Sequence, residues 1–313
     1  MRVTVMGAGA LGGYFGARLA AAGETVTFVA RGAHLAAMQA GGLRVESPLG
    51  DLHLPQVRAV ASPEEAGPAD LVLLMVKTYD VEDAADRLAP TLAPGAAVMT
   101  VQNGVTAPAR VAARIGAERV LAGIVRMPAD LKAPGVIRHS APFHHITLGR
   151  PEGSTADPAP AAAAFAAAGI EVAQTEDIAA ALWEKFVMLA SFAAITCLAR
   201  SDIGPIRETP EAAALLLPLL EEAQAVGRAV CPTLAADVAA RSHGFIGDLP
   251  PGTHASMADD LARGRRLELW DLSGEIVRLG RLHAIATPVH AVALGALAPH
   301  AAGRSARPEQ AGA

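Results

Sequence analysis

The chain has 313 residues, enough for two domains of ordinary size. Apolar residues make up 52% and charged residues 18%, so a large core can form, and a net charge of −5 without any Lys/Arg cluster argues against nucleic-acid binding. No uncharged apolar run of about 18 residues occurs, the N-terminus has no signal-peptide features, and Cys197 and Cys231 are too few for a disulfide framework. We therefore expect a cytoplasmic globular protein that binds neither nucleic acid nor membrane.

The first half of the chain alternates short apolar runs with helical patterns. Strands are predicted where apolar residues run continuously, and helices where they recur at helical spacing. In chain order these are a strand at 3–6, a helix at 11–22, strands at 25–30 and 71–76, a helix at 81–92, a strand at 97–101, a helix at 160–168 and a strand at 170–174. Alternating polarity between 123 and 148, at 136–139 and 145–148, predicts late strands at the sheet edge and leaves open whether they run parallel or antiparallel. This order is typical of a doubly wound α/β sheet.

From residue 177 onward the patterns are helical only. The predicted helices cover 178–198, 210–230, 234–241, 257–280 and 288–297, and 202–204 is predicted to be a loop. Because the composition changes near residue 176, we expect an α/β domain at 1–176 and an all-helical domain at 177–300. The tail 301–313 mixes Gly, Ala, Pro and charged residues, which predicts disorder.

A glycine motif lies directly after the first predicted strand and opens the first helix. Its G-x-G-x-x-G residues are Gly7, Ala8, Gly9, Ala10, Leu11 and Gly12. In dinucleotide-binding proteins the first glycine permits a tight turn, the second lets the backbone approach the pyrophosphate, and the third allows close helix packing. The helix N-terminus would then hold the pyrophosphate. The alternative is a glycine-rich turn that binds nothing.

Arg31 stands where the second predicted strand ends. NAD-specific sites place an acid there to bind the ribose 2′-hydroxyl, but Glu46 is the single acid between residues 25 and 50. An arginine pairs with a 2′-phosphate through two hydrogen bonds. The sequence therefore predicts NADP(H) as the cofactor, with a solvated loop arginine as the alternative.

Lys77 and Asn103 each follow a predicted parallel strand. Ligands of doubly wound sheets bind outside the carboxyl ends of the strands, so both side chains are candidates for the site. An ordinary Asn-Gly turn explains Asn103 equally well.

Several short segments match one protein family in order and spacing. They are VMGAGALG at 5–12, ARG at 30–32, VKTY at 76–79, QNGV at 102–105, LWEKF at 182–186, SM at 256–257, and Glu268 with Gly274. Together they resemble the ketopantoate reductases (2-dehydropantoate 2-reductases) over residues 1 to about 297. The resemblance implies a Rossmann domain, a helical domain and a substrate cleft between them. It implies NADPH-dependent reduction of ketopantoate to (R)-pantoate in pantothenate biosynthesis, and it leaves a homodimer open.

The same resemblance assigns catalytic and binding roles. Lys185 would be the general acid, because an ammonium stabilises the charge that develops on the ketone oxygen and can deliver a proton. Glu268 would bind a substrate hydroxyl, and Ser256 would help to hold the carboxylate. Lys77 and Asn103 match residues near the nicotinamide and the substrate.

Each of these residues also has an ordinary structural explanation. Lys185 could extend its charged end to water. Glu268 could pair with Arg265 on a helix surface, and Ser256 could cap a helix.

Two positions beside Lys185 depart from the family pattern. The family places Asn four and eight residues after the lysine, whereas this chain has Leu189 and Ala193. On a helix both share the face of Lys185, which makes that wall of the substrate site apolar. Trp270 and Ser273 likewise replace an Asp and an Asn of the family. The predicted substrate-binding residues therefore include Leu189 and Ala193 as apolar contacts.

Two further hypotheses stay open for these reasons. One is an NADP-dependent D-2-hydroxyacid dehydrogenase that acts on a more apolar 2-oxo acid. The other is an NADP(H)-binding protein without catalytic activity. The sequence has no Cys/His cluster at zinc-binding spacing, so we expect no metal site.

Overall fold

The computed structural model describes residues 1–304, and contacts divide them into two units. The first unit comprises 1–102 and 106–178, and the second comprises 103–105 with the chain from 179 onward. Most of the tail predicted to be disordered, 301–313, lies outside the described residues. Its first part is held by backbone hydrogen bonds, from Leu267 N–H to the Ala301 carbonyl and from Arg304 N–H to the Gly264 carbonyl.

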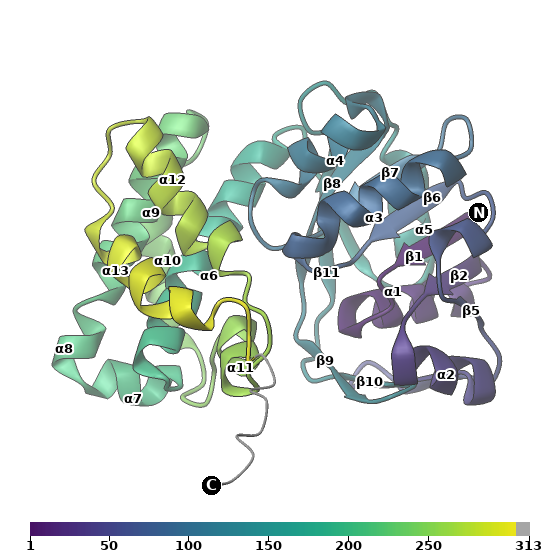
Figure 1. Ribbon diagram of the computed structural model, residues 1–313, viewed down its shortest axis with the longest axis horizontal. Helices are drawn as coiled ribbons and strands as arrows, with labels where there is room; N and C mark the ends of the chain where they lie inside the picture. Colours follow the sequence, from purple (N-terminus) through teal and green to yellow (C-terminus); the bar gives the residue numbers. More distant parts are fainter. Residues whose placement is uncertain (305–313) are drawn as a thin grey trace, which may run out of the picture. The chain divides into compact units, whose positions relative to one another are not determined.

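The first unit is organised around an eight-stranded sheet (Figure 1). Its strands are β1 (Arg2–Met6), β2 (Thr25–Val29), β5 (Arg58–Val60), β6 (Leu71–Leu74), β7 (Ala97–Thr100), β8 (Val120–Arg126), β11 (His145–Gly149) and β12 (Glu171–Gln174). They lie in the order β12-β11-β8-β7-β6-β1-β2-β5, and all neighbours are parallel except β8 and β11. The five strands predicted as continuous apolar runs are confirmed to within two residues.

Helices cover both faces of this sheet. They are α1 (Ala10–Ala21), α2 (Gly32–Gly41), α3 (Val81–Leu88), α4 (Ala107–Ile115) and α5 (Ala159–Ala167). Alternate residues of β6 point to opposite faces, so Leu73 packs in the core beneath α1 and α5, whereas Leu74 packs beneath α3 and α4. Two-sided burial explains why the central strands are continuous apolar runs.

A second sheet of four strands is absent from the sequence-based prediction. Its strands are β3 (Leu43–Glu46), β4 (Leu52–Leu54), β9 (Ala129–Ala133) and β10 (Val136–His139), in the order β4-β3-β10-β9. The prediction that 136–139 lies at the edge of the main sheet is therefore wrong, whereas β11 does lie near that edge. Val45 and Ile137 are both fully buried in the core that includes α1, so this pairing is stabilised by packing between distant segments.

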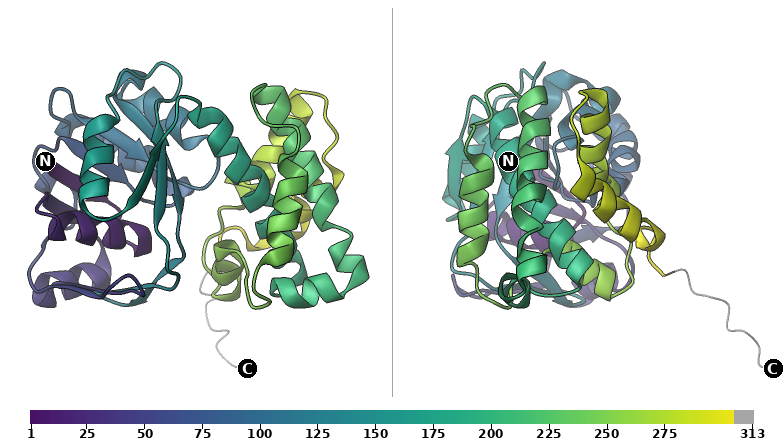
Figure 2. Two further views of the ribbon diagram at one scale, coloured as in Figure 1. Left: turned by 180° about the vertical axis from the view of Figure 1, so that it is seen from behind. Right: turned by 90° about the vertical axis from the view of Figure 1, so that its left-hand side faces the viewer.

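The second unit is helical throughout its described residues. Its helices are α6 (Ile178–Ala199), α7 (Ile203–Glu208), α8 (Pro210–Ala213), α9 (Leu216–Val230), α10 (Val238–Asp248), α11 (Ser256–Ala262), α12 (Ser273–Leu282) and α13 (Pro288–Leu297). Helix α9 contacts α10, α12 and α13, and Figure 2 shows these helices packed as a bundle. The predicted class, a doubly wound α/β sheet followed by an all-helical domain, is confirmed.

Helix α6 is the one helix of the described residues that is long and apolar enough to cross a membrane. Its side chains Phe186, Val187 and Ile195 are buried in the core of the helical unit. A core helix meets the same length and composition criterion as a membrane span, so α6 by itself does not indicate a membrane protein.

Three local predictions in this unit are wrong. Residues 202–204 do not form a simple loop, because α7 begins at Ile203, where Ile203 and Ile206 enter the core. Helix α10 lies at 238–248 rather than 234–241. Burial of Val238 and Ile246 stabilises the helix although it contains two glycines. The predicted helix 257–280 is interrupted between α11 and α12, where Gly264 adopts φ +63°. Tertiary packing overrides local propensity at each place.

Candidate active site

The glycine motif forms the turn between β1 and α1, and its glycines are required by close contacts. Gly7 has φ +102°, and a Cβ there would lie 2.9 Å from the Met75 carbonyl carbon. A Cβ on Gly12 would lie 2.2 Å from the Gly7 carbonyl oxygen, so no side chain fits between the turn and the helix. Both positions are structural requirements of a tight strand–turn–helix connection.

Gly9 differs, because a Cβ at this position would meet nothing within 4 Å. It is exposed and forms the N-cap of α1, with no side-chain cap and no acidic residue in the first turn. The first N–H groups of a helix lack intrahelical partners and carry partial positive charge. The turn between Gly7 and Gly12 therefore has the open space and the donors that a dinucleotide pyrophosphate requires.

Arg31 is exposed at the N-cap of α2, just after the carboxyl end of β2. Its guanidinium forms no hydrogen bond or ion pair with any other described residue. The neighbouring first turn of α2 contains no acid. The side chain is thus available for an anion such as a 2′-phosphate.

Lys77 and Gln102 lie at the carboxyl ends of β6 and β7. Lys77 is half-buried and precedes a short 3-10 helix, Thr78–Asp80. The Gln102 amide donates hydrogen bonds to the carbonyls of Leu74 (2.7 Å) and Val76 (3.1 Å), while its Oε1 is buried without a partner among the described residues. Gln102 therefore fixes the strand end that carries Lys77.

In the second unit, the structure brings Lys185 and Asn103 together. Lys185 Nζ donates to Asn103 Oδ1 at 3.2 Å, although 82 positions separate the two residues. Lys185 is half-buried in the first half of α6. Asn103 and Gly104 precede α4 in the chain but belong by contacts to the helical unit. An amide oxygen at this distance can orient the ammonium.

Leu189 and Ala193 follow Lys185 by one and two turns of the same helix. The continuous helix places all three side chains on one side of α6. Leu189 is half-buried and Ala193 is buried. Of the two, only Leu189 is partly accessible on this side of α6, because Ala193 packs in the core of the helical unit.

Glu268 and Ser256 also belong to the helical unit. Glu268 is buried at 4% exposure, on an irregular segment before the 3-10 helix Leu269–Asp271. Arg265, its alternative partner, forms an ion pair with Asp260 at 3.7 Å. Ser256 is exposed and is the first residue of α11, whose N-cap is Ala255, so the capping explanation is not supported.

The two other departures from the family pattern differ in exposure. Trp270 is 58% exposed, whereas Ser273 is fully buried and its hydroxyl pairs with His290 Nδ1 at 3.3 Å. Ser273 therefore belongs to the core of the helical unit.

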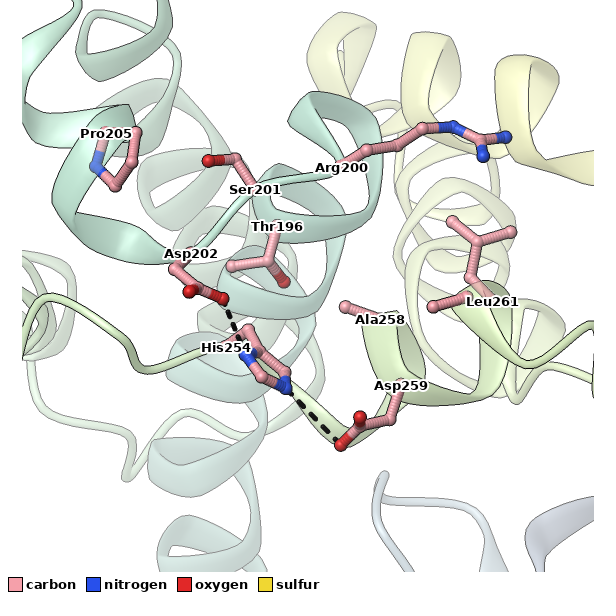
Figure 3. Close-up of a pocket in the computed structure, with 10 residues that line it drawn as sticks. Thr196, Arg200, Ser201, Asp202, Pro205, His254, Ala258, Asp259 and Leu261 are labelled. Carbon is pink, nitrogen blue, oxygen red and sulfur yellow. Dashed lines mark hydrogen bonds and ion pairs between the residues drawn. The ribbon is translucent and has the colours of Figure 1, made fainter.

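A separate cavity of about 400 Å³ lies at the end of α6 (Figure 3). Its lining residues are Thr196, Arg200, Ser201, Asp202, Pro205, His254, Ala258, Asp259, Leu261 and Ala262. His254 links two carboxylates, with Nδ1 at 2.7 Å from Asp202 and Nε2 at 3.4 Å from Asp259. None of the residues predicted for cofactor or substrate lines this cavity, and its charged groups largely pair with one another.

Two polar side chains near the glycine turn were not predicted from the sequence. Gln102 directly precedes the candidate Asn103 in the sequence, but no sequence pattern indicates its hydrogen bonds to the end of β6. His34, three residues after Arg31, is buried with its Nε2 unpartnered among the described residues. For both residues, the only indication in the sequence was that a polar side chain occurs close to a candidate motif.

Comparison with known proteins identifies relatives of the whole chain. A family model described as Ketopantoate reductase PanE/ApbA matches residues 3–153, and its C-terminal counterpart matches 177–301. A 2-dehydropantoate 2-reductase of Mesorhizobium japonicum is 35% identical over 311 residues, which covers 92% of this chain and 94% of that protein.

Solved structures agree with this result. A PanE/ApbA family ketopantoate reductase from Ralstonia eutropha has a TM-score of 0.88 and 33% identity, covering 96% of this chain and 98% of that one. A D-mandelate dehydrogenase in complex with NADH and anilino(oxo)acetate has a TM-score of 0.87 over the same shares of both chains. Its identity is 19%, so this second likeness concerns the fold alone.

Proposed function

Because this chain belongs to the ketopantoate reductase family of oxidoreductases, we propose that it reduces ketopantoate to (R)-pantoate with NADPH. The observation that carries the proposal is the contact between Lys185 Nζ and Asn103 Oδ1 at 3.2 Å. It holds an ammonium in a half-buried position of the helical unit, as a general acid requires. Two unpaired cysteines suit a reducing compartment, in line with a cytoplasmic step of pantothenate biosynthesis.

The first unit would hold the cofactor. The N–H groups at the start of α1, in the turn from Gly7 to Gly12, bind the pyrophosphate, and Arg31 pairs with the 2′-phosphate. Lys77, which follows β6 at the carboxyl edge of the sheet, would lie close to the nicotinamide half of the cofactor. When bound, NADPH supplies the hydride for the ketone carbon.

Lys185 supplies the proton. Its ammonium stabilises the negative charge that develops on the ketone oxygen and transfers a proton from Nζ to that oxygen, and solvent then reprotonates the amine. Asn103 orients the ammonium through its Oδ1. The ketone carbon gains a hydride and its oxygen gains a proton, which gives the alcohol.

The remaining residues of the helical unit would bind the substrate. Glu268 accepts a hydrogen bond from a substrate hydroxyl, and Ser256 donates to the carboxylate. Leu189 and Ala193 support a second candidate substrate, because they offer no hydrogen bond on the side of α6 that carries Lys185. A hydroxylated 2-oxo acid would lose hydrogen bonds to water by binding there without replacing them, whereas a more apolar 2-oxo acid would not.

Turnover of purified full-length protein tests the proposal. The loss of NADPH absorbance is followed with ketopantoate and, in parallel, with a panel of apolar 2-oxo acids. Efficient turnover of ketopantoate supports the first candidate, and turnover of apolar acids alone supports the second. NADPH binding without turnover of any 2-oxo acid would contradict both candidate substrates and would support an NADP(H)-binding protein without catalytic activity.

Substitution of the proposed acid tests the mechanism. We expect Lys185→Met to lower kcat by about 10²–10⁴-fold with little effect on NADPH binding. The matched control is Lys132→Met, because Lys132 is exposed and pairs with Glu46 on the second sheet. Equal activity of the Lys185→Met variant and the control would exclude Lys185 as the acid.

A further inference from the structure

His34 is a buried histidine of α2 whose ring orientation is fixed by a hydrogen bond. The backbone N–H of Gly135, in the turn between β9 and β10, donates to His34 Nδ1 at 3.0 Å. The side chain is 9% exposed. In a neutral imidazole one nitrogen accepts and the other carries the proton, so the proton of His34 is on Nε2.

This Nε2–H group has no normal hydrogen-bond partner. It is one of three buried side-chain atoms in the described chain without a partner, the others being Arg18 Nε and Gln102 Oε1. Burial lowers the pKa of His34, and the carbonyl of Ala8 acts in the opposite direction, which places that carbonyl near the ring. An unmade buried hydrogen bond is costly, so an unpartnered buried group of this kind calls for an explanation.

The Ala8 carbonyl belongs to the peptide that also contains the Gly9 N–H. In a planar trans peptide the C=O and N–H point in opposite directions. The N–H of Ala8 is already fixed by the Val29 carbonyl at 2.9 Å. A hydrogen bond from His34 to the Ala8 carbonyl would therefore aim the Gly9 N–H away from the ring, on the far side of the peptide.

We propose that His34 is a positioning residue for the dinucleotide: its Nε2–H completes a hydrogen bond to the Ala8 carbonyl when the cofactor binds, and so orients the Gly9 N–H toward the pyrophosphate. The inference rests on the proposed function, since it requires a dinucleotide at the glycine turn. Through Gly135 it also connects that turn to the second sheet.

Two variants of full-length protein separate the two hydrogen bonds of the ring. In His34→Asn the amide oxygen can still accept from Gly135, but no donor reaches Ala8. In His34→Gln the longer amide can still donate toward Ala8. We expect His34→Asn to raise the Kd for NADPH about tenfold, which corresponds to about 1.4 kcal/mol. His34→Gln restores most of the affinity, and the Tm of both ligand-free proteins stays within about 3 °C of wild type.

The outcomes distinguish this role from simple packing. NADPH binding by His34→Asn within about twofold of wild type would overturn the inference. So would a parallel loss of affinity and Tm in both variants, since the ring would then only fill space. Failure of the wild-type protein to bind NADPH would instead refute the proposed function.

Nuclear magnetic resonance of the wild-type protein gives a test that does not depend on variant folding. With isotope-labelled histidine, we expect the Nε2 proton of His34 to shift downfield when NADPH is added, because a new hydrogen bond forms. An unchanged resonance at saturating NADPH would overturn the inference.

Discussion

At the scale of single residues, the charge of Arg31 is the feature we expect to select the cofactor. Its guanidinium is exposed and unpaired among the described residues, so it can pair fully with a 2′-phosphate. We expect Arg31→Ala to lower kcat/KM for NADPH by about 10–100-fold and to leave that for NADH nearly unchanged, since a charged hydrogen bond contributes about 1.5–3 kcal/mol. Steady-state rates with both cofactors provide the measurement.

Arg58→Ala is the control for this prediction. Arg58 begins β5, where it lies opposite Thr27 of β2, and its guanidinium donates a hydrogen bond to the Glu65 carbonyl. An equal loss with NADPH and NADH in the Arg31 variant would contradict a role in phosphate recognition.

The candidate residues also show how much of the site can be predicted from the sequence. Lys185, Asn103, Glu268 and Ser256 were identified from motifs in the sequence. Their side-chain partners were not, because a hydrogen bond between residues 82 positions apart leaves no periodic signal in either segment. For the same reason His34 was not identified.

At the scale of elements, substitutions at Gly9 and Gly12 should separate effects on NADPH binding from effects on thermal stability. Gly9→Ala adds a methyl group to open space at a normal backbone angle, so we expect unchanged thermal stability and weaker NADPH binding, since the methyl group blocks close approach of the pyrophosphate. Gly12→Ala places a methyl group 2.2 Å from the Gly7 carbonyl, so we expect a clear loss of Tm. Thermal unfolding and NADPH titration of both variants check this, and tight NADPH binding by Gly9→Ala would contradict it.

The N-terminus of α13 offers a second prediction at this scale. The Glu222 carboxylate accepts the backbone N–H groups of Val289 (2.8 Å) and His290 (2.9 Å). We expect Glu222→Gln to lower the free energy of unfolding by about 1–2 kcal/mol, because one acceptor and the charge at the helix N-terminus are lost. Urea denaturation measures the change, with exposed Glu221→Gln as the control; equal stability of the two variants would refute the capping role.

The helices themselves were predicted unevenly. Helix α13 was predicted at its observed bounds, because Pro288 suits the first turn and an apolar pattern follows. The α10 prediction was displaced by four residues at its start, since two glycines weakened the local signal and burial of Ile246 sustains the helix.

At the scale of the whole molecule, buried histidines make stability depend on pH. His290 is fully buried between Ser273 and the Leu219 carbonyl, and burial lowers its pKa to about 4. The unfolded chain takes up a proton below about pH 6.5, whereas the folded protein does so only near pH 4. The contribution of neutral His290 is therefore present above pH 6.5 and is lost as the pH falls to 4, by about 3 kcal/mol in total.

Urea denaturation between pH 7 and pH 4 checks this expectation. His290→Gln keeps a donor for Leu219 but does not titrate, so its stability should fall less steeply over that range. His34, His139 and His144 of the first unit have lowered pKa values from burial as well, so wild type and variant should both lose some stability in acid. Parallel curves for the two proteins would contradict the assignment to His290.

By itself, the sequence determined six of the eight strands of the main sheet and three of its five helices, the helical nature of the second half, the glycine turn and the family, whereas β5, β8, α2 and α4 were not predicted. These features are local, since each depends on the periodicity or spacing of residues within one short segment. The continuous apolar run of β6 and the glycine spacing after β1 are examples.

Only the tertiary structure decided which distant segments meet. The second sheet pairs β3 with β10, about ninety residues later: the sequence predicted a strand at 136–139 but assigned it to the main sheet, and it did not predict the four-residue β3. The Lys185–Asn103 and His34–Gly135 contacts arise in the same way. Short strands and buried polar pairs gain their stability from partners brought together by folding, which local sequence patterns do not encode.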